Sequence, residues 1–249
     1  MTLDRRRIVS LDLGADADTT WAHLRRPELV RRWYGWDAEG LDLEIHQVFV
    51  AGVQAASDGL RRSLSWPDGT RLELSPTADP ARTHLAVERP SHGELSFFDG
   101  VRDDVDEAWT AYAHQLQFAL GVHRGENRRT WSARGLDAGP RRDRLLDHVG
   151  LHGVRGVPIG GHVSAVRPAG TRVGGVLAYR TELQFGLRLR GIAGSFLVVM
   201  EHPAAIRPPN GEIDVVLSTY GLDDDLFAEV TRRWSGWWRR PATVGRRVG

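Results

Sequence analysis

A long amphipathic segment, preceded by segments with strand-like alternation, is the feature that most constrains the fold of this chain. Residues 104–124 (DVDEAWTAYAHQLQFALGVHR) place apolar side chains at three- and four-residue steps, namely at Val105, Trp109, Tyr112, Leu116 and Leu120. This spacing predicts a helix with one apolar face. The preceding segments 43–53, 60–76 and 82–89 alternate apolar and polar residues between Asp-Gly and Asp-Pro turn signals, which is typical of antiparallel strands. The first half is therefore predicted to be an antiparallel sheet closed by one long helix.

The start of the chain is predicted to form a strand followed by two short helices. Residues 7–13 alternate imperfectly and predict the strand. The Asp- and Thr-rich residues 16–21 are suited to capping a helix. Pro27 and Gly35 are suited to beginning and ending a second helix.

The second half of the chain repeats this order of elements. Arg134–Arg144 is rich in glycine, proline and charge and is predicted to be a linker. A short helix-like stretch, several strand-like stretches and a helix-like segment at 225–240 follow it. The turns at 98–104 and 220–224 match each other, each with a glycine and acidic residues that would cap the next helix. We therefore expect two lobes, residues 1–134 and 135–249, the second without an evident opening strand.

The composition excludes several classes of function. The formal charge of +1 gives the chain no overall attraction to nucleic acid or to an anionic membrane. All 33 basic residues are arginine, which excludes Schiff-base lysines and the P-loop lysine and suggests a bacterium with a GC-rich genome. The absence of cysteine excludes disulfides, thiolate nucleophiles and Cys-ligated zinc. The first residues contain no apolar run long enough for a signal peptide or membrane span, so a cytoplasmic location is expected.

Two segments resemble a known family. Residues 8–35 (IVSLDLGADADTTWAHLRRPELVRRWYG) resemble the opening of SRPBCC proteins related to the activator of the ninety-kilodalton heat-shock protein ATPase: a strand, an acidic turn, a Trp-containing helix, a PEL turn and a Trp-Tyr pair. Residues 97–120 are similar to the family's closing helix, and the likeness covers roughly residues 5–132. It implies an α+β helix-grip fold of the START/SRPBCC, birch-pollen-allergen-like kind, with a curved antiparallel sheet around a long C-terminal helix. The repeated order of elements extends this expectation to two tandem lobes, and the cavity between sheet and helix suits an apolar ligand.

Six residues are the candidate ligand contacts. They share an apolar or aromatic side chain near the expected cavity: Trp33, Trp36, Trp66, Trp109, Tyr112 and Leu116. Each could equally fill the core, because an aromatic ring buries a large apolar area. Trp109 and Tyr112 are the stronger candidates, because the closing helix is expected to turn its apolar face towards the cavity.

No residue is assigned a catalytic or metal-binding role. His114 falls at the edge of the apolar face of its helix, and His148 and His152 lie beside glycines without a third ligand. No nucleotide-binding glycine motif or nucleophile elbow is present. The Arg- and Trp-rich segment 232–240 is interpreted as a closing helix that packs Leu226, Val230, Trp234 and Trp237 and exposes its arginines. No cofactor is expected.

Three functions are compatible with these observations. The leading hypothesis is non-catalytic binding or sequestration of a hydrophobic small molecule, for example in self-resistance to an enediyne-type antibiotic or in its biosynthesis. The alternative is an enzyme of the polyketide cyclase or aromatase type, and a further alternative is a co-chaperone-like protein-interaction module. Nucleic-acid binding and membrane insertion are not expected, and a homodimer is compatible with each hypothesis.

Overall fold

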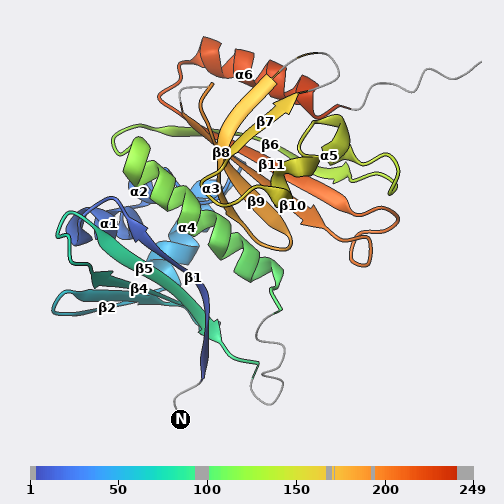
Figure 1. Cartoon of the computed structure of the whole chain (residues 1–249). Helices are drawn as coiled ribbons and strands as arrows, with labels where there is room; N and C mark the ends of the chain where they lie inside the picture. Colours follow the sequence, from blue (N-terminus) through green and yellow to red (C-terminus); the bar gives the residue numbers. More distant parts are fainter. Residues whose placement is uncertain (1–3, 93–100, 167–169, 171, 192–193, 240–249) are drawn as a thin grey trace, which may run out of the picture. The chain divides into compact units, whose positions relative to one another are not determined.

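The chain divides into two compact units that each contain one sheet. The computed structural model describes residues 4–92, 101–166, 170, 172–191 and 194–239. The units are Met1–Thr130 and Trp131–Gly249, and each combines an antiparallel sheet with helices (Figure 1). The predicted division at 134/135 stays a prediction. No helix in the described part of the chain is both long and apolar enough to cross a membrane.

The first unit is a five-stranded sheet with helices inserted after its first strand and one long helix at its end. Its strands run in the order β1-β5-β4-β3-β2, so the first strand pairs with the last. The elements are β1 (Arg5–Leu13), α1 (Ala17–Arg25), α2 (Pro27–Val30), α3 (Leu41–His46), the π-helix η1 (Gln47–Ala51), β2 (Gln54–Asp58), β3 (Arg61–Ser65), β4 (Arg71–Pro76), β5 (Thr83–Pro90) and α4 (Asp104–Val122). The predicted opening of a strand and two short helices is confirmed.

Local chemistry explains where the first helices begin. The side chain of Asp16 accepts a hydrogen bond from the backbone N–H of Thr19 at 2.8 Å and caps α1. Pro27 occupies the first turn of α2, where its missing N–H costs nothing.

Residues 43–51 are helical rather than extended, and the prediction of a strand over residues 43–53 is wrong. The buried residues Leu41, Ile45 and Phe49 recur at four-residue steps, which is the spacing of a helix face. Leu43, which the alternating pattern would have buried, is 62% exposed. The apolar alternation in this stretch is therefore incidental to a short helix that continues into η1.

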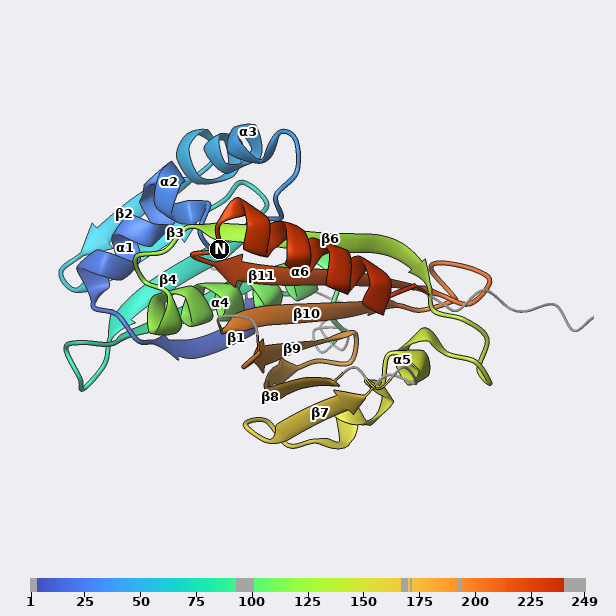
Figure 2. The ribbon, with the colours of Figure 1, turned by 90° about the horizontal axis from the view of Figure 1, so that it is seen from above.

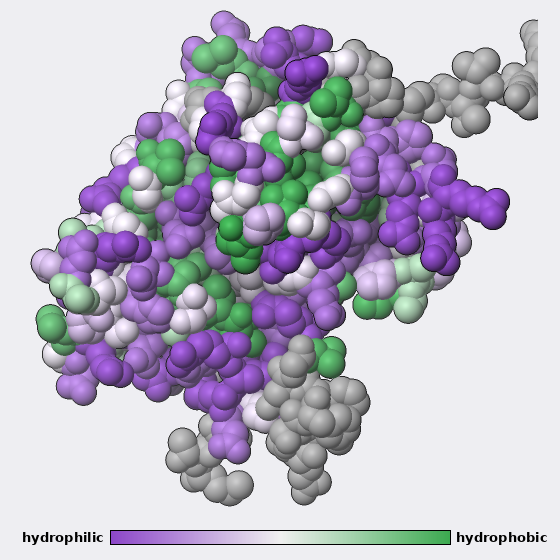
Figure 3. Space-filling model, viewed as in Figure 1, coloured by the Kyte–Doolittle hydropathy of each residue, from purple (hydrophilic) through white to green (hydrophobic). Residues whose placement is uncertain are grey.

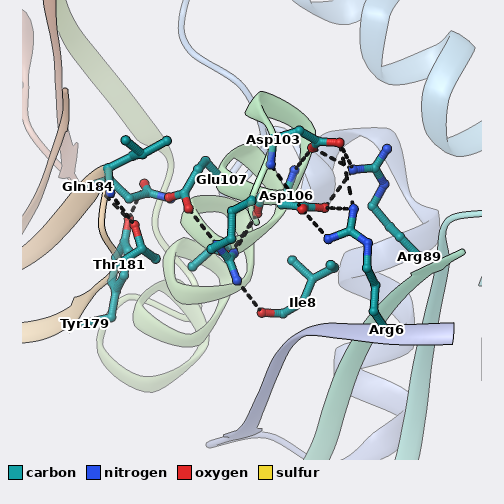
Figure 4. Close-up of polar contacts among 12 residues, drawn as sticks. Arg6, Ile8, Arg89, Asp103, Asp106, Glu107, Tyr179, Thr181 and Gln184 are labelled. Atoms are coloured by element: carbon teal, nitrogen blue, oxygen red, sulfur yellow. Dashed lines mark hydrogen bonds and ion pairs between the residues drawn. The ribbon is translucent and has the colours of Figure 1, made fainter. Parts of the chain in front are cut away.

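The long helix α4 is held to the sheet at its N-terminus by a buried ionic network. Asp103 caps the helix by accepting from the backbone N–H of Asp106 at 2.8 Å. Asp106 is fully buried and accepts hydrogen bonds from Arg6 of β1 and Arg89 of β5 (Figure 4). Arg102 donates to Glu107 at 2.6 Å and to the carbonyl of Ile8 at 3.1 Å. The start of α4 is thus fixed to both strands on which the helix rests.

The second unit repeats this arrangement with six strands. The elements are β6 (Arg128–Asp137), α5 (Leu145–His148), the 3-10 helix η3 (His152–Gly156), β7 (His162–Val166), β8 (Arg172–Arg180), β9 (Gln184–Leu189), β10 (Ser195–His202), β11 (Glu212–Tyr220) and α6 (Asp224–Trp237). Its strand order is β6-β11-β10-β9-β8-β7, so its first strand again pairs with its last. The predicted fold class, α+β with two helix-grip lobes, is confirmed.

An opening strand is present in the second unit, contrary to the expectation that it had eroded. Residues 134–137, which were assigned to the linker, belong to this strand, β6. Of its ten residues only three are buried, and two of those are polar or charged. The apolar alternation by which a strand is recognised is therefore nearly absent from its sequence.

Tryptophans of the last helix fill the interior of the second unit. Val230, Trp234 and Trp237 of α6 pack with Trp131 and with the inner faces of β8 to β11, and Figure 2 shows α6 lying along this sheet. Arg232 and Arg233 are exposed and bind Glu229. The interpretation of 232–240 as a packed closing helix is therefore confirmed as far as Trp237, where α6 ends. Leu226 is an exception, because it is 55% exposed.

The matching turns before the two long helices are described only in part. Asp223 caps α6 through the N–H of Leu226 at 2.8 Å, as Asp103 caps α4. Both predicted caps are confirmed. Residues 98–100 of the first turn lie outside the described residues.

A candidate ligand cavity in the first unit

A cavity of about 520 Å³ opens beside the N-terminal half of α4 in the first unit. Its walls come from α4, from the turn between β3 and β4, and from the segment around α2 and η1. The lining residues are Tyr34, Val48, Trp66, Pro67, Asp68, Thr70, Asp104, Val105, Ala108, Trp109 and Tyr112. The volume lies in the range of small-molecule sites, and the lining is mostly apolar, as in such sites.

The β3–β4 turn positions Trp66. The indole N–H of Trp66 donates to the carbonyl of Val48 at 2.8 Å, and its backbone pairs with Thr70 at 2.9 Å. Gly69 closes the turn with a φ of +82°, and a Cβ at this position would lie 2.5 Å from the ring of Pro90. Glycine is therefore required here. The Trp66 ring meets the Trp109 ring of α4 with centroids 4.8 Å apart and planes at 54°, so the two rings form a corner of the cavity.

The opposite wall contains Tyr34 and Tyr112, whose ring centroids lie 4.5 Å apart. The hydroxyl of Tyr34 donates to Glu44 of α3 at 2.8 Å. Burial, and next the neighbouring Tyr112, raise the pKa of Tyr34 well above its usual range. Tyr34 is thus a neutral hydrogen-bond donor at the cavity wall.

The structure brings together three of the six candidate ligand residues. Trp66, Trp109 and Tyr112 line the cavity. Trp36 contacts the ring of Tyr112 at 5.8 Å but is not part of the lining. Trp33 and Leu116 are fully buried in the core of the unit. The indole N–H of Trp33 donates to the carbonyl of His23 at 2.8 Å and anchors the turn that carries Tyr34.

Several lining residues were not among the candidates. Tyr34 lies in the Trp-Tyr pair of the family-like opening, so a signal for it was present in the sequence. Val48 was obscured by the incorrect strand assignment. Asp68 and Asp104 carry the signals of a turn and a helix start, which gave no reason to place them in a cavity.

The polar part of the lining is acidic. Asp68 accepts hydrogen bonds from the N–H and the hydroxyl of Thr70, at 2.9 and 2.8 Å. Asp104 is exposed in the first turn of α4. Among the described lining residues there is no arginine or histidine. Elsewhere the surface of this unit, at the lower left of Figure 3, is largely hydrophilic with small hydrophobic patches.

A second cavity, of about 470 Å³, lies in the second unit and has a different character. Arg155 donates to Glu201 at 2.6 Å in its wall, and Arg141, Arg144 and Glu182 add further charges. No group of three or more His, Cys, Asp or Glu residues that could hold a metal ion occurs in the described part of either unit. The first cavity is therefore the one with the apolar lining that a hydrophobic ligand requires.

Comparisons with known proteins give a distant likeness in fold. No protein-family model and no curated protein sequence matches the chain. Two solved structures of di-domain ARO/CYC proteins are similar to it. BexL, from the BE-7585A biosynthetic pathway, is 11% identical, with a TM-score of 0.35 over 96% of this chain and 100% of that one. StfQ, from the steffimycin biosynthetic pathway, is 10% identical, with a TM-score of 0.32 over 89% of this chain and 86% of that one.

Proposed function

We propose that the first unit binds an apolar, ring-containing small molecule in the cavity beside α4. The observation that carries the proposal is the lining, in which Tyr34, Trp66, Trp109 and Tyr112 surround a space of about 520 Å³. Flat aromatic rings stack well on one another and present a large apolar area with little loss of side-chain freedom. A planar hydrophobic ligand is the molecule that this wall suits best.

Several finer assignments belong to the same proposal. We infer from residues 5–132 that the first unit is an SRPBCC protein related to the heat-shock protein ATPase activator, and from the composition that it works in a bacterial cytoplasm. Sequestration of a natural product such as an enediyne-type antibiotic is the biological role we propose first. Such a role needs a closed apolar site and no catalytic group. If the chain were instead a co-chaperone-like module, a pull-down would recover a protein partner, and the cavity would bind no ligand.

An aromatase or cyclase is the second candidate, and one observation favours it. Burial keeps the Tyr34 hydroxyl protonated at the cavity wall, so by turning from Glu44 it could donate a hydrogen bond to a substrate carbonyl and hold it for cyclisation. The ARO/CYC identity of BexL and StfQ accords with this candidate rather than with sequestration. Incubation with a polyketide substrate separates the two, because an enzyme would release a cyclised product and lose this activity in a Tyr34→Phe variant.

Blocking the cavity tests the proposal that is common to both candidates, namely that an apolar molecule binds beside α4. Ala108 is a half-buried residue of the lining, so an Ala108→Trp variant would fill the cavity beside Trp66 and Trp109. We expect the neutral fluorescent probe N-phenyl-1-naphthylamine to bind the unmodified chain and to bind this variant at least about ten-fold more weakly. Ala81→Trp, on an exposed loop outside the cavity, adds the same indole and is the control. Equal binding by all three proteins, or no binding by any, would contradict the proposal.

A further inference from the structure

The acidic groups around α4 differ in how their charge is balanced. Asp103 binds Arg89 at 2.6 Å, Asp106 binds Arg6 at 2.5 Å and Arg89 at 2.7 Å, and Glu107 binds Arg102 at 2.6 Å. Each of these three carboxylates has an arginine partner. Together they form a neutralised network on one side of the helix N-terminus.

The two carboxylates that line the cavity have no such partner among the described residues. Within the described residues, Asp68 accepts only from the neutral N–H and hydroxyl of Thr70, and Asp104 forms no ion pair. A carboxylate offers about four lone-pair positions, so Asp68 keeps acceptor capacity after serving Thr70. Asp68 belongs to the β3–β4 turn and Asp104 to α4, so negative charge enters the cavity wall from two separate elements.

The aromatic residues form a cage rather than a flat stack. The ring of Trp109 is inclined at 54° to that of Trp66 and at 87° to that of Tyr112, with centroids 4.8 and 6.3 Å apart. These rings all line the same cavity, so a ligand inside it lies beside more than one aromatic ring. A cation within about 6 Å of a ring centroid is attracted by the negative face of the ring, most strongly by tryptophan.

Building on the proposed function, we propose that the ligand of this cavity carries a positive charge: an aromatic or alicyclic molecule with a protonated amine or a quaternary ammonium group. The apolar body stacks on Trp66 and Trp109. The cationic group lies against the ring faces, where Asp68 and Asp104 balance its charge. These two carboxylates disfavour an anionic ligand of the same shape.

A pair of isosteric probes tests the charge preference directly. Benzyltrimethylammonium and neopentylbenzene have the same shape and differ only in the charged nitrogen, and each can compete with N-phenyl-1-naphthylamine for the cavity. We expect the cation to bind about ten-fold more tightly than its neutral isostere at low salt. The preference should decrease as sodium chloride is added, because salt screens the two exposed carboxylates.

Two double variants assign the preference to the cavity. Asp68→Asn with Asp104→Asn should remove most of the preference for the cation, measured as the ratio of the affinities for benzyltrimethylammonium and neopentylbenzene. Asp79→Asn with Asp224→Asn is the matched control, because Asp79 accepts from the N–H of Ala81 in another turn and Asp224 begins α6. This control should keep the preference.

The possible results separate the inference from the proposed function. Equal affinity for the two isosteres, failure of the cation to compete, or a preference that persists in the Asp68/Asp104 variant would overturn the charge inference, while N-phenyl-1-naphthylamine continues to bind. Failure of the unmodified chain to bind any of the three probes would overturn the proposed function itself.

Discussion

At the scale of single residues, His23 shows how the first unit depends on burial. His23 lies buried on α1, its ring Nδ1–H donates to the carbonyl of Thr19 at 2.9 Å, and its own carbonyl accepts from Trp33. Burial lowers the pKa of His23, and the nearby Arg32, Arg124 and Arg26 lower it further against the opposing bond to Thr19. The imidazole is therefore neutral in the folded chain at neutral pH.

The stability of the chain should depend on pH through His23. An unfolded histidine gains its proton near pH 6.5, whereas the folded chain resists protonation of His23 to lower pH. The folded state is thus stabilised by neutral His23 above about pH 6.5, and this stabilisation is lost as the pH falls below that value. We expect the free energy of unfolding, measured by urea titration at pH 7.5 and 5.5, to fall less in His23→Asn than in the unmodified chain. Exposed His46→Asn is the control, and an identical fall in His23→Asn and the unmodified chain would disprove this account.

At the scale of elements, the attachment of α4 depends on the buried Asp106. Removing its charge leaves the buried Arg6 with only the longer, 3.8 Å ion pair to Asp103, and breaking a buried ion pair costs about 3–5 kcal/mol. Asp106→Asn should therefore lower the free energy of unfolding by about 3 kcal/mol. Asp103 is the more exposed partner of Arg89, because 47% of the Asp103 side chain is accessible. Asp103→Asn should therefore lower the free energy of unfolding by less than about 1 kcal/mol. Equal losses in the two variants would show that burial of Asp106 is not what holds the helix.

The elements that could be predicted are those whose periodicity is carried by many residues. The apolar face of α4 recurs over five turns, and the β3–β4 hairpin combines alternation with an Asp-Gly turn. By contrast, α3 and η1 contain too few residues for a helical period to outweigh chance alternation. The strand β6 is held in the sheet by its pairing with β11 rather than by burial of its own side chains. Long-range pairing of this kind leaves little trace in local sequence.

At the scale of the whole molecule, the two units share a topology and differ in their interiors. In each, the first strand pairs with the last and a long helix follows. Trp234 and Trp237 occupy the interior of the second unit, whereas Trp66 and Trp109 of the first unit leave a space between elements. The proposed binding function therefore belongs to the first unit.

The candidate site could be predicted only in its aromatic part. Trp109 and Tyr112 follow from the helical period of α4, and Trp66 from the hairpin that carries it. Trp33, Trp36 and Leu116 have the same chemical character, so only packing distinguishes them from lining residues. In the sequence, Asp68 has the signal of a turn and Asp104 that of a helix start. That both also line the cavity depends on the tertiary fold, which local sequence does not reveal.

The most direct test of the central claim is a crystal structure of the chain with N-phenyl-1-naphthylamine. The account predicts density for the probe in the cavity beside α4, in contact with the rings of Trp66, Trp109 and Tyr112. Density for the probe at another place in the chain, with the cavity beside α4 empty, would contradict it.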